Sequence, residues 1–298
     1  MRVRLRTHGG QGVWAPILLL AIAAACAMPA APADGWRPLF LGVDHAALES
    51  PDPRPLRAHV LRIDLDAPGV AFMATPGAAV EGGHTYGRKT TTLLRQYGLQ
   101  AAVNAAPFSP VVSVEGWPHS ISGLTMCAAE VVSPPSGLPA LLIGCDNTVV
   151  FAEPPFEIRD TCTAVAGFAI ILRAGANVGR DDALHPRTAA ACSQDGRTLY
   201  LMVVDGRQPG YSEGVTTREL ADWLLCLGAW DGLNLDGGGT SAMAVEGPDG
   251  EPRLLNRPIH AGIPGTERPG PSHLGLWAPR LPDRMGTGGM GGDGAHAN

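Results

Sequence analysis

The chain has 298 residues, of which 45% are hydrophobic and 17% are charged, and its formal net charge is −6. This composition excludes a disordered chain, and the absence of a linker between the apolar segments favours one large domain. The 39 glycines and 27 prolines indicate many turns and few long helices. We therefore expect a strand-rich single domain of the α+β or mixed α/β class.

The first 33 residues have the order of a secretory signal peptide. Three arginines precede an apolar stretch at 13–27, and small residues follow as far as Ala33. The stretch is too short for a transmembrane helix, so the mature chain is predicted to begin at Asp34. An alternative uses Cys26 as the lipid-bearing first residue of a lipoprotein. Both interpretations predict a secreted, periplasmic or cell-surface protein.

The charge of the predicted mature chain bears on its partners. Without the three arginines of the signal segment, 19 basic residues stand against 28 acidic ones, a net charge of −9. An acidic surface of this kind repels polyanions. No nucleic-acid partner is therefore expected.

The predicted elements begin with an N-terminal lead-in at 34–58, and the main domain spans 59–280. Residues 59–77 have the pattern of a strand, a turn and a second strand. Residues 90–104 predict a short helix closed by Gly98 and then a buried strand that ends at Asn104. The last residues, 281–298, are rich in glycine and are expected to be disordered.

Five cysteines follow the signal segment. Cys127 and Cys145 bracket two predicted strands around a Pro/Gly turn, and pairing of these strands would bring the two thiols together. We predict that disulfide first, with Cys162–Cys192 as the second candidate. Cys226 lies in an apolar helical segment and is expected to be a buried thiol. None of the cysteine spacings is typical of a zinc site, so no metal is assigned.

Residues 198–235 predict a βαβ unit. TLYLMVV at 198–204 is apolar on both alternating faces, as a strand covered on both sides must be. A helix follows, with a capping box at Thr216 and Glu219 and a glycine stop at Gly228. GLNL at 232–235 is the second strand. We therefore expect a mixed sheet whose two parallel strands, joined by a right-handed crossover, end at one edge.

A polar loop follows each of these two strands: Asp205-Gly206-Arg207-Gln208 and Asp236-Gly237-Gly238-Gly239-Thr240-Ser241. Open α/β sheets bind ligands at the carboxyl ends of parallel strands, so both loops should face one cleft. Glycines let backbone N–H groups approach an anion closely, and hydroxyl groups add donors. An anionic or oxygen-rich ligand is implied. The alternative for the first loop is a simple turn whose Asp accepts local N–H groups.

Residues 185–245 resemble the core of the phosphodiester glycosidase family. The shared motifs come in the same order: PRT, a strand ending in DGR, a YS-x-G stretch, a helix and NLDGGGTS. AAVNAAPF at 101–108 resembles the family's Asn-Gly-Gly-Phe-Phe motif, and 254–278 resemble its closing N-x-P and E-R segments. The resemblance covers 59–280. It departs at Ala105, Ala106 and Pro107, which replace two glycines and an aromatic residue.

The resemblance implies a glycosidase that cleaves a sugar-1-phosphodiester, or a related envelope or exopolysaccharide linkage, at the anomeric carbon. The transition state resembles an oxocarbenium ion, and the phosphate that leaves needs little acid assistance. Asp205 and Asp236 are the predicted catalytic carboxylates. Arginine forks would hold the phosphate and asparagine side chains the sugar hydroxyls. The predicted substrate-binding residues are Asn104, Arg187, Thr188, Arg207, Asn234, Gly237, Gly238, Gly239, Thr240 and Ser241.

Two neighbouring residues are left out of this predicted site. A His before Pro, as at His185, is more often a local hydrogen-bonding residue than a general acid. Glu267 precedes Arg268 and is expected to form an ion pair with it. No cofactor is predicted, although a cleft rich in aspartate has room for a divalent cation.

A second class of function also fits the sequence: a non-catalytic carbohydrate-binding protein that kept the cleft and lost turnover through its Asn-Ala-Ala-Pro segment. The retained PRT, DGR and DGGGTS motifs favour the enzyme. In both cases the expected partner is a carbohydrate or a glycosyl phosphate. The sequence does not define the sugar, the stereochemical outcome or the oligomeric state.

Overall fold

Alternating apolar residues place β17 (Thr198–Val204) at the centre of the largest sheet. In the computed structural model, which describes residues 35–282, Leu199, Leu201 and Val203 pack into the main core. The intervening side chains, including Met202 and Val204, pack into a second cluster with α2 (Thr217–Cys226). The prediction of a strand covered on both faces is therefore confirmed.

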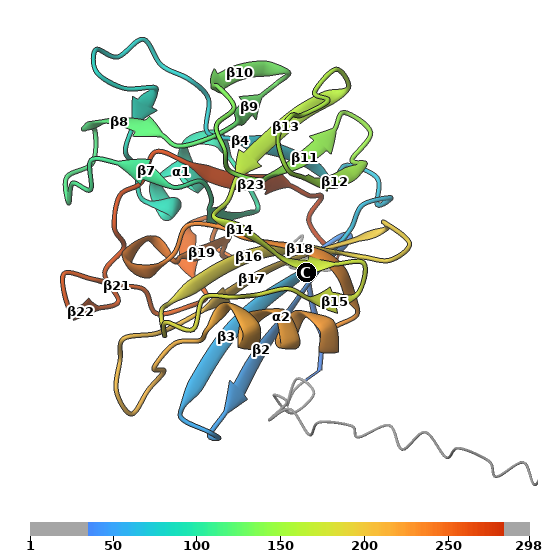
Figure 1. The fold of residues 1–298 in the computed structure, drawn as a ribbon, viewed down its shortest axis with the longest axis vertical. Coiled ribbons are helices and arrows are strands. Elements are labelled where there is room, and N and C mark those ends of the chain that lie inside the picture. Colours follow the sequence, from blue (N-terminus) through green and yellow to red (C-terminus); the bar gives the residue numbers. More distant parts are fainter. Residues whose placement is uncertain (1–34, 283–298) are drawn as a thin grey trace, which may run out of the picture.

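This sheet has eight strands in the order β1-β2-β3-β17-β16-β18-β14-β15 (Figure 1). In its middle, β17 pairs on one side with β3, where Leu201 lies opposite Leu61, and on the other side with β16, where Leu201 lies opposite Ala190. The remaining strands are β1 (Arg37–Phe40), β2 (Val43–Ser50), β3 (Leu56–Asp64), β14 (Ala169–Arg173), β15 (Ala176–Asn177), β16 (Arg187–Ser193) and β18 (Ala229–Asn234).

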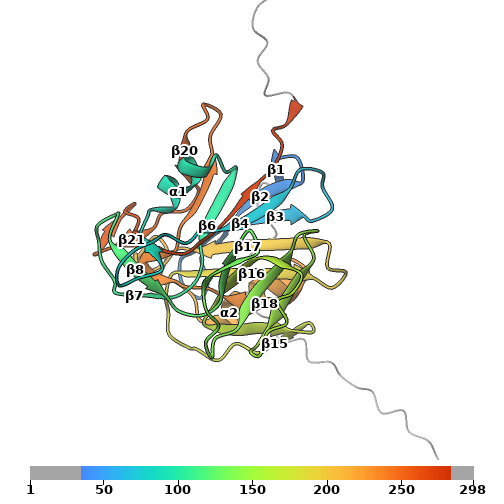
Figure 2. The same cartoon turned by 90° about the horizontal axis from the view of Figure 1, so that it is seen from above.

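A second, five-stranded sheet has the order β20-β19-β6-β23-β4, and α1 (Thr90–Tyr97) packs against it. Gly98, with φ 59°, ends this helix as predicted. Figure 2 shows α1 and α2 on opposite sides of the strands. The strands are β4 (Ala71–Ala74), β6 (Ala101–Asn104), β19 (Met243–Glu246), β20 (Pro252–Leu254) and β23 (His273–Trp277).

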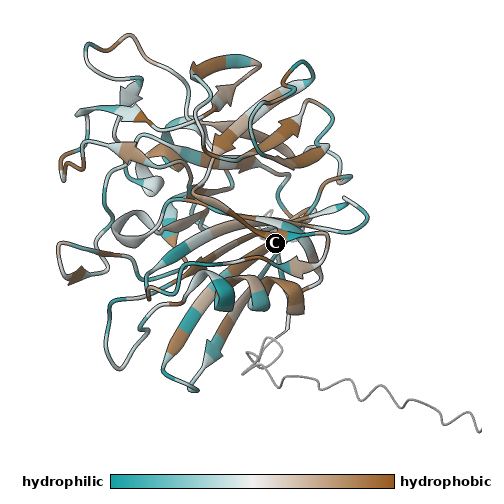
Figure 3. Ribbon diagram, viewed as in Figure 1, coloured by the Kyte–Doolittle hydropathy of each residue, from teal (hydrophilic) through white to brown (hydrophobic). Residues whose placement is uncertain are grey.

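The third sheet, β10-β9-β13-β11-β12, completes the main core, in which residues of all three large sheets meet. The hydrophobic colouring in Figure 3 accordingly follows the strands. The strands are β9 (Thr125–Cys127), β10 (Glu130–Ser133), β11 (Ala140–Gly144), β12 (Val149–Ala152) and β13 (Thr161–Ala166). Smaller sheets contain β5 (Thr85–Tyr86), β7 (Phe108–Ser109) and β8 (Pro118–Ile121), and β21 (Ile259–His260) with β22 (Ile263–Pro264).

The predicted βαβ unit is present with one correction. The helix α2 has the expected Thr216–Glu219 capping box, and Gly228 follows it with φ 95°. However, β17 and β18 do not pair, because β16 lies between them and is antiparallel to both. The strand pairs of residues 35–282 are antiparallel, so the mixed sheet was a wrong expectation. The two strands still point in the same direction, and both end at one edge of the sheet. The handedness of their connection stays a prediction.

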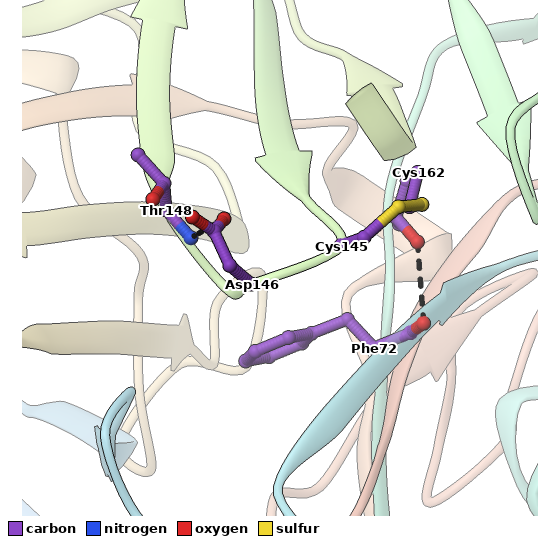
Figure 4. The surroundings of a disulfide bond; sticks show 6 residues. Phe72, Cys145, Asp146, Thr148 and Cys162 are labelled. Carbon is purple, nitrogen blue, oxygen red and sulfur yellow. Dashed lines mark hydrogen bonds between the residues drawn. A yellow bond between two sulfur atoms is a disulfide. The ribbon is translucent and has the colours of Figure 1, made fainter. Parts of the chain in front are cut away.

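The predicted cysteine pairing is also wrong. A disulfide joins Cys145 to Cys162 (Figure 4), and Cys127 and Cys192 are unpaired within the described part of the chain. The reason is the sheet order, since β13 inserts between β9 and β11 and carries Cys162 to the end of β11. Cys226 is exposed rather than buried, and its thiol donates to the Asp222 carbonyl at the end of α2 (2.8 Å).

This pairing predicts a specific effect of mutation. Cys162→Ser should lower the free energy of unfolding by about 2 to 3 kcal/mol, because the bond closes a loop of 17 residues. Denaturant unfolding measures the loss, with Cys127→Ser as the control that leaves the bond intact. Non-reducing peptide mapping that links Cys127 to Cys145 would contradict the prediction.

The ends of the chain bear on the predicted targeting. The signal segment, the mature start at Asp34, the lipoprotein cysteine Cys26 and the disordered tail from 283 onward lie outside the described residues. Residues 35–58, expected as a lead-in, supply β1, β2 and the first part of β3 to the largest sheet. Among residues 35–282, helices capable of spanning a bilayer are absent.

Candidate active site

The two predicted loops meet at one edge of the largest sheet. β17 and β18 end there, and β16 and β14 begin there because they run in the opposite direction. Arg187 accordingly lies opposite Val204, and Ala169 lies opposite Asn234. This arrangement brings the loop after β18, the start of β16 and Phe168 around a common space.

Two adjoining cavities occupy this edge. The smaller, which we call the Asp236 cavity, has a volume of about 220 Å³ and is lined by Phe168, His185, Pro186, Arg187, Arg207, Leu235, Asp236, Gly237, Gly238 and Arg268. The larger, the outer cavity, has a volume of about 800 Å³. It is lined by Gly137, Pro139, Glu153, Phe168, Ala169, Ile170, Arg173, Val178, Arg180, Asp181, His185, Arg187, Thr217 and Asn234. Phe168, His185 and Arg187 belong to both and form their common boundary.

Asp236 is the carboxylate of the smaller cavity and is only 9% exposed. The Thr240 hydroxyl donates to its Oδ2 at 2.6 Å, and Arg268 Nη2 lies 3.6 Å from the same oxygen. Burial raises the pKa of Asp236, although Thr240 and Arg268 act in the opposite direction. A carboxyl group of this kind is suited to take up or release a proton in the working range of an enzyme.

Three guanidinium groups share the Asp236 cavity. Arg187 is buried and fixed, with Nη2 donating to Asp181 Oδ2 (2.8 Å) and to the Ala183 carbonyl (2.7 Å). Arg207 is exposed, and its Nη2 lies 3.1 Å from His185 Nδ1. Arg268 is the third. Convergent guanidinium groups match the geometry and charge of a phosphate.

His185 is a residue that sequence reasoning set aside. Burial, Arg207 and Arg187 all lower the pKa of its ring, so the imidazole is neutral near pH 7. A neutral ring can accept the hydrogen bond from Arg207 at Nδ1. The predicted role of a local hydrogen-bonding residue fits, and the ring also lines both cavities.

Arg268 was also not predicted as a site residue. Glu267, its expected ion-pair partner, instead accepts hydrogen bonds from the backbone N–H and hydroxyl of Thr91 at the start of α1 (3.1 and 2.6 Å). This contact leaves Arg268 to reach Asp236 and the Gly237 carbonyl (3.3 Å). The only sequence signal for Arg268 was its place in the E-R segment.

The three glycines lack side chains and so let the loop after β18 pack closely between the start of β16 and the side chains of Arg207 and Arg268. A Cβ on Gly237 would lie 2.7 Å from the Pro186 carbonyl oxygen, so only glycine fits that approach. Gly238 has φ 68°, and its N–H donates to the same carbonyl at 2.9 Å. A Cβ on Gly239 would meet His260 and Arg268 at 3.2 and 3.3 Å. At Gly238 the donor expected for the substrate is thus used within the protein.

Gly238→Ala tests this packing. The change should cost about 1 kcal/mol of stability because alanine is strained at positive φ. Its Cβ would also lie 3.1 Å from Arg207 Nη1, so the guanidinium must move and KM should rise. Thermal unfolding and steady-state kinetics measure the two effects. An unchanged KM would show that the position of Arg207 does not matter for substrate.

Asn104 and Thr188 lie behind the cavity rather than in its wall. Asn104 Oδ1 accepts from the Thr188 hydroxyl (2.6 Å) and the Ala242 N–H (3.2 Å), and its Nδ2 donates to the Asp236 carbonyl (2.7 Å). Both side chains are buried. They connect β6 and β16 with the loop that begins at Asp236 and position its backbone, and their predicted contact with sugar stays a prediction.

The departure from the family motif at Ala105 and Ala106 is structurally mild. Both alanines are buried, and neither has positive φ. The Ala105 carbonyl accepts the Asp236 N–H (2.7 Å), and Ser272 supplies partners for both alanine N–H groups. The segment therefore supports the Asp236 loop without backbone strain.

Asp205, the second predicted carboxylate, is 1% exposed and lines neither cavity. Its Oδ1 accepts from Asn256 Nδ2 (2.8 Å), and both oxygens accept from the Arg257 N–H (3.1 and 3.0 Å). Asn256 in turn donates to the Ser241 carbonyl (3.0 Å). Burial raises the pKa of Asp205 to about 6, despite these donors. The DGR, DGGGTS and N-x-P segments are thus joined in the interior.

The remaining predicted residues divide between interior and cavity. Thr240 binds Asp236 directly, as described above. Ser241 is buried, and its hydroxyl lacks a partner among the described residues. Asn234 is buried too and lines the outer cavity, and its Oδ1 has no hydrogen-bond partner within residues 35–282. Within residues 35–282, groups of three or more His, Cys, Asp or Glu side chains that could hold a metal ion are absent.

The fold and these cavities define a strand-rich protein with a buried carboxyl group beside three arginines. The model of the phosphodiester glycosidase family matches residues 97–277, more than half of the chain. The chain therefore belongs to the phosphodiester glycosidase family. No curated protein sequence matches it.

Solved structures share the fold. The chain is similar to the zebrafish N-acetylglucosamine-1-phosphodiester α-N-acetylglucosaminidase catalytic domain auto-inhibited by its pro-peptide, with a TM-score of 0.59, 19% identity and coverage of 85% of this chain and 87% of that one. A hypothetical protein from Synechocystis is similar with a TM-score of 0.60 and 13% identity, over 81% of this chain and 64% of that one. A Burkholderia pseudomallei protein described as exported is similar with a TM-score of 0.51 and 16% identity, over 75% of this chain and 74% of that one. The TM-scores support a common fold despite identities below 20%.

Proposed function

We propose that the protein is a secreted glycosidase that hydrolyses a glycosyl phosphodiester, or a related envelope or exopolysaccharide linkage, at the anomeric carbon. The observation that carries this proposal is Asp236, a buried carboxyl group in a cavity with Arg187, Arg207 and Arg268. The family supplies the glycosidase class. The order of the N-terminal segment and the exported relative support secretion.

In this proposal the arginines hold the phosphate and Asp236 acts at the sugar. A water oxygen attacks the anomeric carbon, and the bond from that carbon to the phosphate oxygen breaks with its electron pair going to the phosphate. Asp236 accepts the proton of the water, and its negative charge stabilises the oxocarbenium-like transition state. Phosphate is a good leaving group, so the reaction does not require a second carboxyl group as acid.

We assign Asp205 a positioning role in this reaction. Its hydrogen bonds run through Asn256 to the Ser241 carbonyl, at the end of the loop that begins with Asp236. Neither oxygen lines a cavity, so direct contact with substrate is disfavoured. Loss of Asp205 should therefore lower activity indirectly, by changing the geometry of that loop.

The first substrate to test is an N-acetylglucosamine phosphodiester, because the zebrafish relative is named for that activity. Purified protein should release free N-acetylglucosamine from UDP-N-acetylglucosamine or from the methyl ester of N-acetylglucosamine-1-phosphate. Asp236→Asn is the matched control for contaminating activity. Binding of these donors without release of sugar by the wild type would instead support the non-catalytic carbohydrate-binding protein. Neither binding nor release from a panel of glycosyl phosphodiesters would contradict the proposal.

A further inference from the structure

We propose that the outer cavity binds the leaving half of the substrate, and that this half carries a second negative charge together with hydroxyl or N–H donors. The inference rests on the proposed function, since it assigns a second subsite of the same reaction. It specifies a class of substrate: a sugar phosphodiester whose other ester is an anionic polyol, such as a sugar acid or a nucleotide.

The position of Arg187 supports this division of the substrate. The bond that breaks must lie at Asp236, which lines only the smaller of the two cavities. Arg187 lines both, so a phosphate held by its guanidinium stands at their boundary. The group esterified to that phosphate can then extend into the outer cavity. A volume of about 800 Å³ suits an organic group larger than the phosphate itself.

The charges of the outer cavity favour an anion. Its walls hold Arg173, Arg180 and Arg187 against Glu153 and Asp181. Arg173 pairs with Glu153 (2.7 Å), and Arg187 pairs with Asp181 (2.8 Å). Arg180 lacks an ion-pair partner among the residues that the structure describes. A surplus cation in the cavity of a protein with net charge −6 is an attractive site for a second negative group.

Asn234 adds an independent requirement. Its side chain is 2% exposed and lines the outer cavity, and Oδ1 is buried without a hydrogen-bond partner among the described residues. A buried acceptor of this kind is costly to leave unpaired. Oδ1 is shielded from the cavity in this structure, so a rotation of the amide would have to present it to an O–H or N–H donor on a ligand. A ligand with such a donor and a negative charge is an anionic polyol rather than a neutral aglycone.

Kinetics with three donors test the proposal. Each carries N-acetylglucosamine-1-phosphate, joined to methanol or to glucuronic acid as an ester or to uridine monophosphate as an anhydride, so only the last two have a second charge. Arg180→Ala should raise KM for both charged donors by about fivefold, the size expected for one charge contact. The change for the methyl donor should stay below about twofold. The more affected charged donor identifies the anion as phosphate or carboxylate.

Arg159→Ala is the matched control, because Arg159 is exposed and lies in neither cavity. It should leave KM unchanged for all three donors. Equal effects of Arg180→Ala on the methyl and charged donors would overturn the proposal. So would Arg180→Ala kinetics that match those of Arg159→Ala on every donor.

A binding measurement separates this inference from the proposed function. Isothermal titration of UDP should give a Kd that rises by about fivefold in Arg180→Ala and stays constant in Arg159→Ala. If UDP binds with this dependence but no donor is hydrolysed, the anionic subsite stands and the proposed glycosidase activity fails. If UDP does not bind, or binds both variants equally, the subsite is overturned.

Discussion

Asp236→Asn should reduce kcat on a glycosyl phosphodiester by about 10³-fold or more, the size expected for a lost catalytic base. The amide has nearly the shape of the carboxyl group, and its oxygen can still accept the hydrogen bond from Thr240. What disappears is the charge and the capacity to take up a proton. Steady-state kinetics measure the loss, and circular dichroism and thermal unfolding should show a folded variant.

The control is Asp160→Asn, which removes an exposed carboxyl group outside both cavities and should retain full activity. The wild-type pH profile offers a second check. Burial raises the pKa of Asp236, and the base must be ionised, so kcat should fall as pH falls through that raised pKa. If Asp236→Asn kept wild-type activity, the catalytic assignment would be wrong and the DGGGTS loop would have a structural role only.

Asp205→Ala should act mainly on stability and lower the free energy of unfolding at neutral pH by about 3 kcal/mol. The change removes the acceptor for Asn256 Nδ2 and for the Arg257 N–H in a buried position, and each unsatisfied donor costs about 1–3 kcal/mol. Denaturant unfolding measures the loss, with Asp160→Ala as the exposed control. A variant as stable as wild type that lacks activity would contradict the positioning role and restore Asp205 as a catalytic residue.

The pH dependence of stability gives a separate test of Asp205. Its pKa in the folded protein is about 6, above the ordinary value of 3.8, so the folded state holds the proton more tightly than the unfolded state. The part of this group's contribution that depends on its bound proton is therefore full below about pH 4 and is lost as pH rises through 6, whereas the hydrogen bonds from Asn256 and Arg257 remain at neutral pH. The expected loss is about 3 kcal/mol. Measured unfolding free energies of wild type minus Asp205→Ala should show this trend.

Local sequence patterns correctly predicted those strands, helices and helix ends that are determined by residues close together in the chain. The apolar alternation of β17, the capping box of α2 and the glycine after α1 are short-range features, and each appears as predicted. The shared direction of β17 and β18 was also predictable, because the helix between them returns the chain to the edge of the sheet where β17 begins. Motif order identified the family, which the match over 97–277 shows.

Pairing between distant segments could not be derived in the same way. β16 and β13 each insert between strands that the sequence suggested as neighbours, and one insertion removed the mixed sheet while the other changed the disulfide. Similarly, a polar residue at a strand end can face a cavity or the interior. Asn104, Thr188 and Asp205 face partners that come from elsewhere in the chain.

The sequence by itself thus determined the strand-rich fold class, the local elements, the family and the Asp236 loop as a candidate active-site loop. Only the tertiary structure decided that Asp236 shares a cavity with Arg268 and His185, that Asp205 binds Asn256 inside the protein, and that Cys145 pairs with Cys162. The physical reason is range. Propensity, capping and alternation act within about ten residues, whereas strand order and the partners of buried polar groups depend on contacts between segments far apart in the chain.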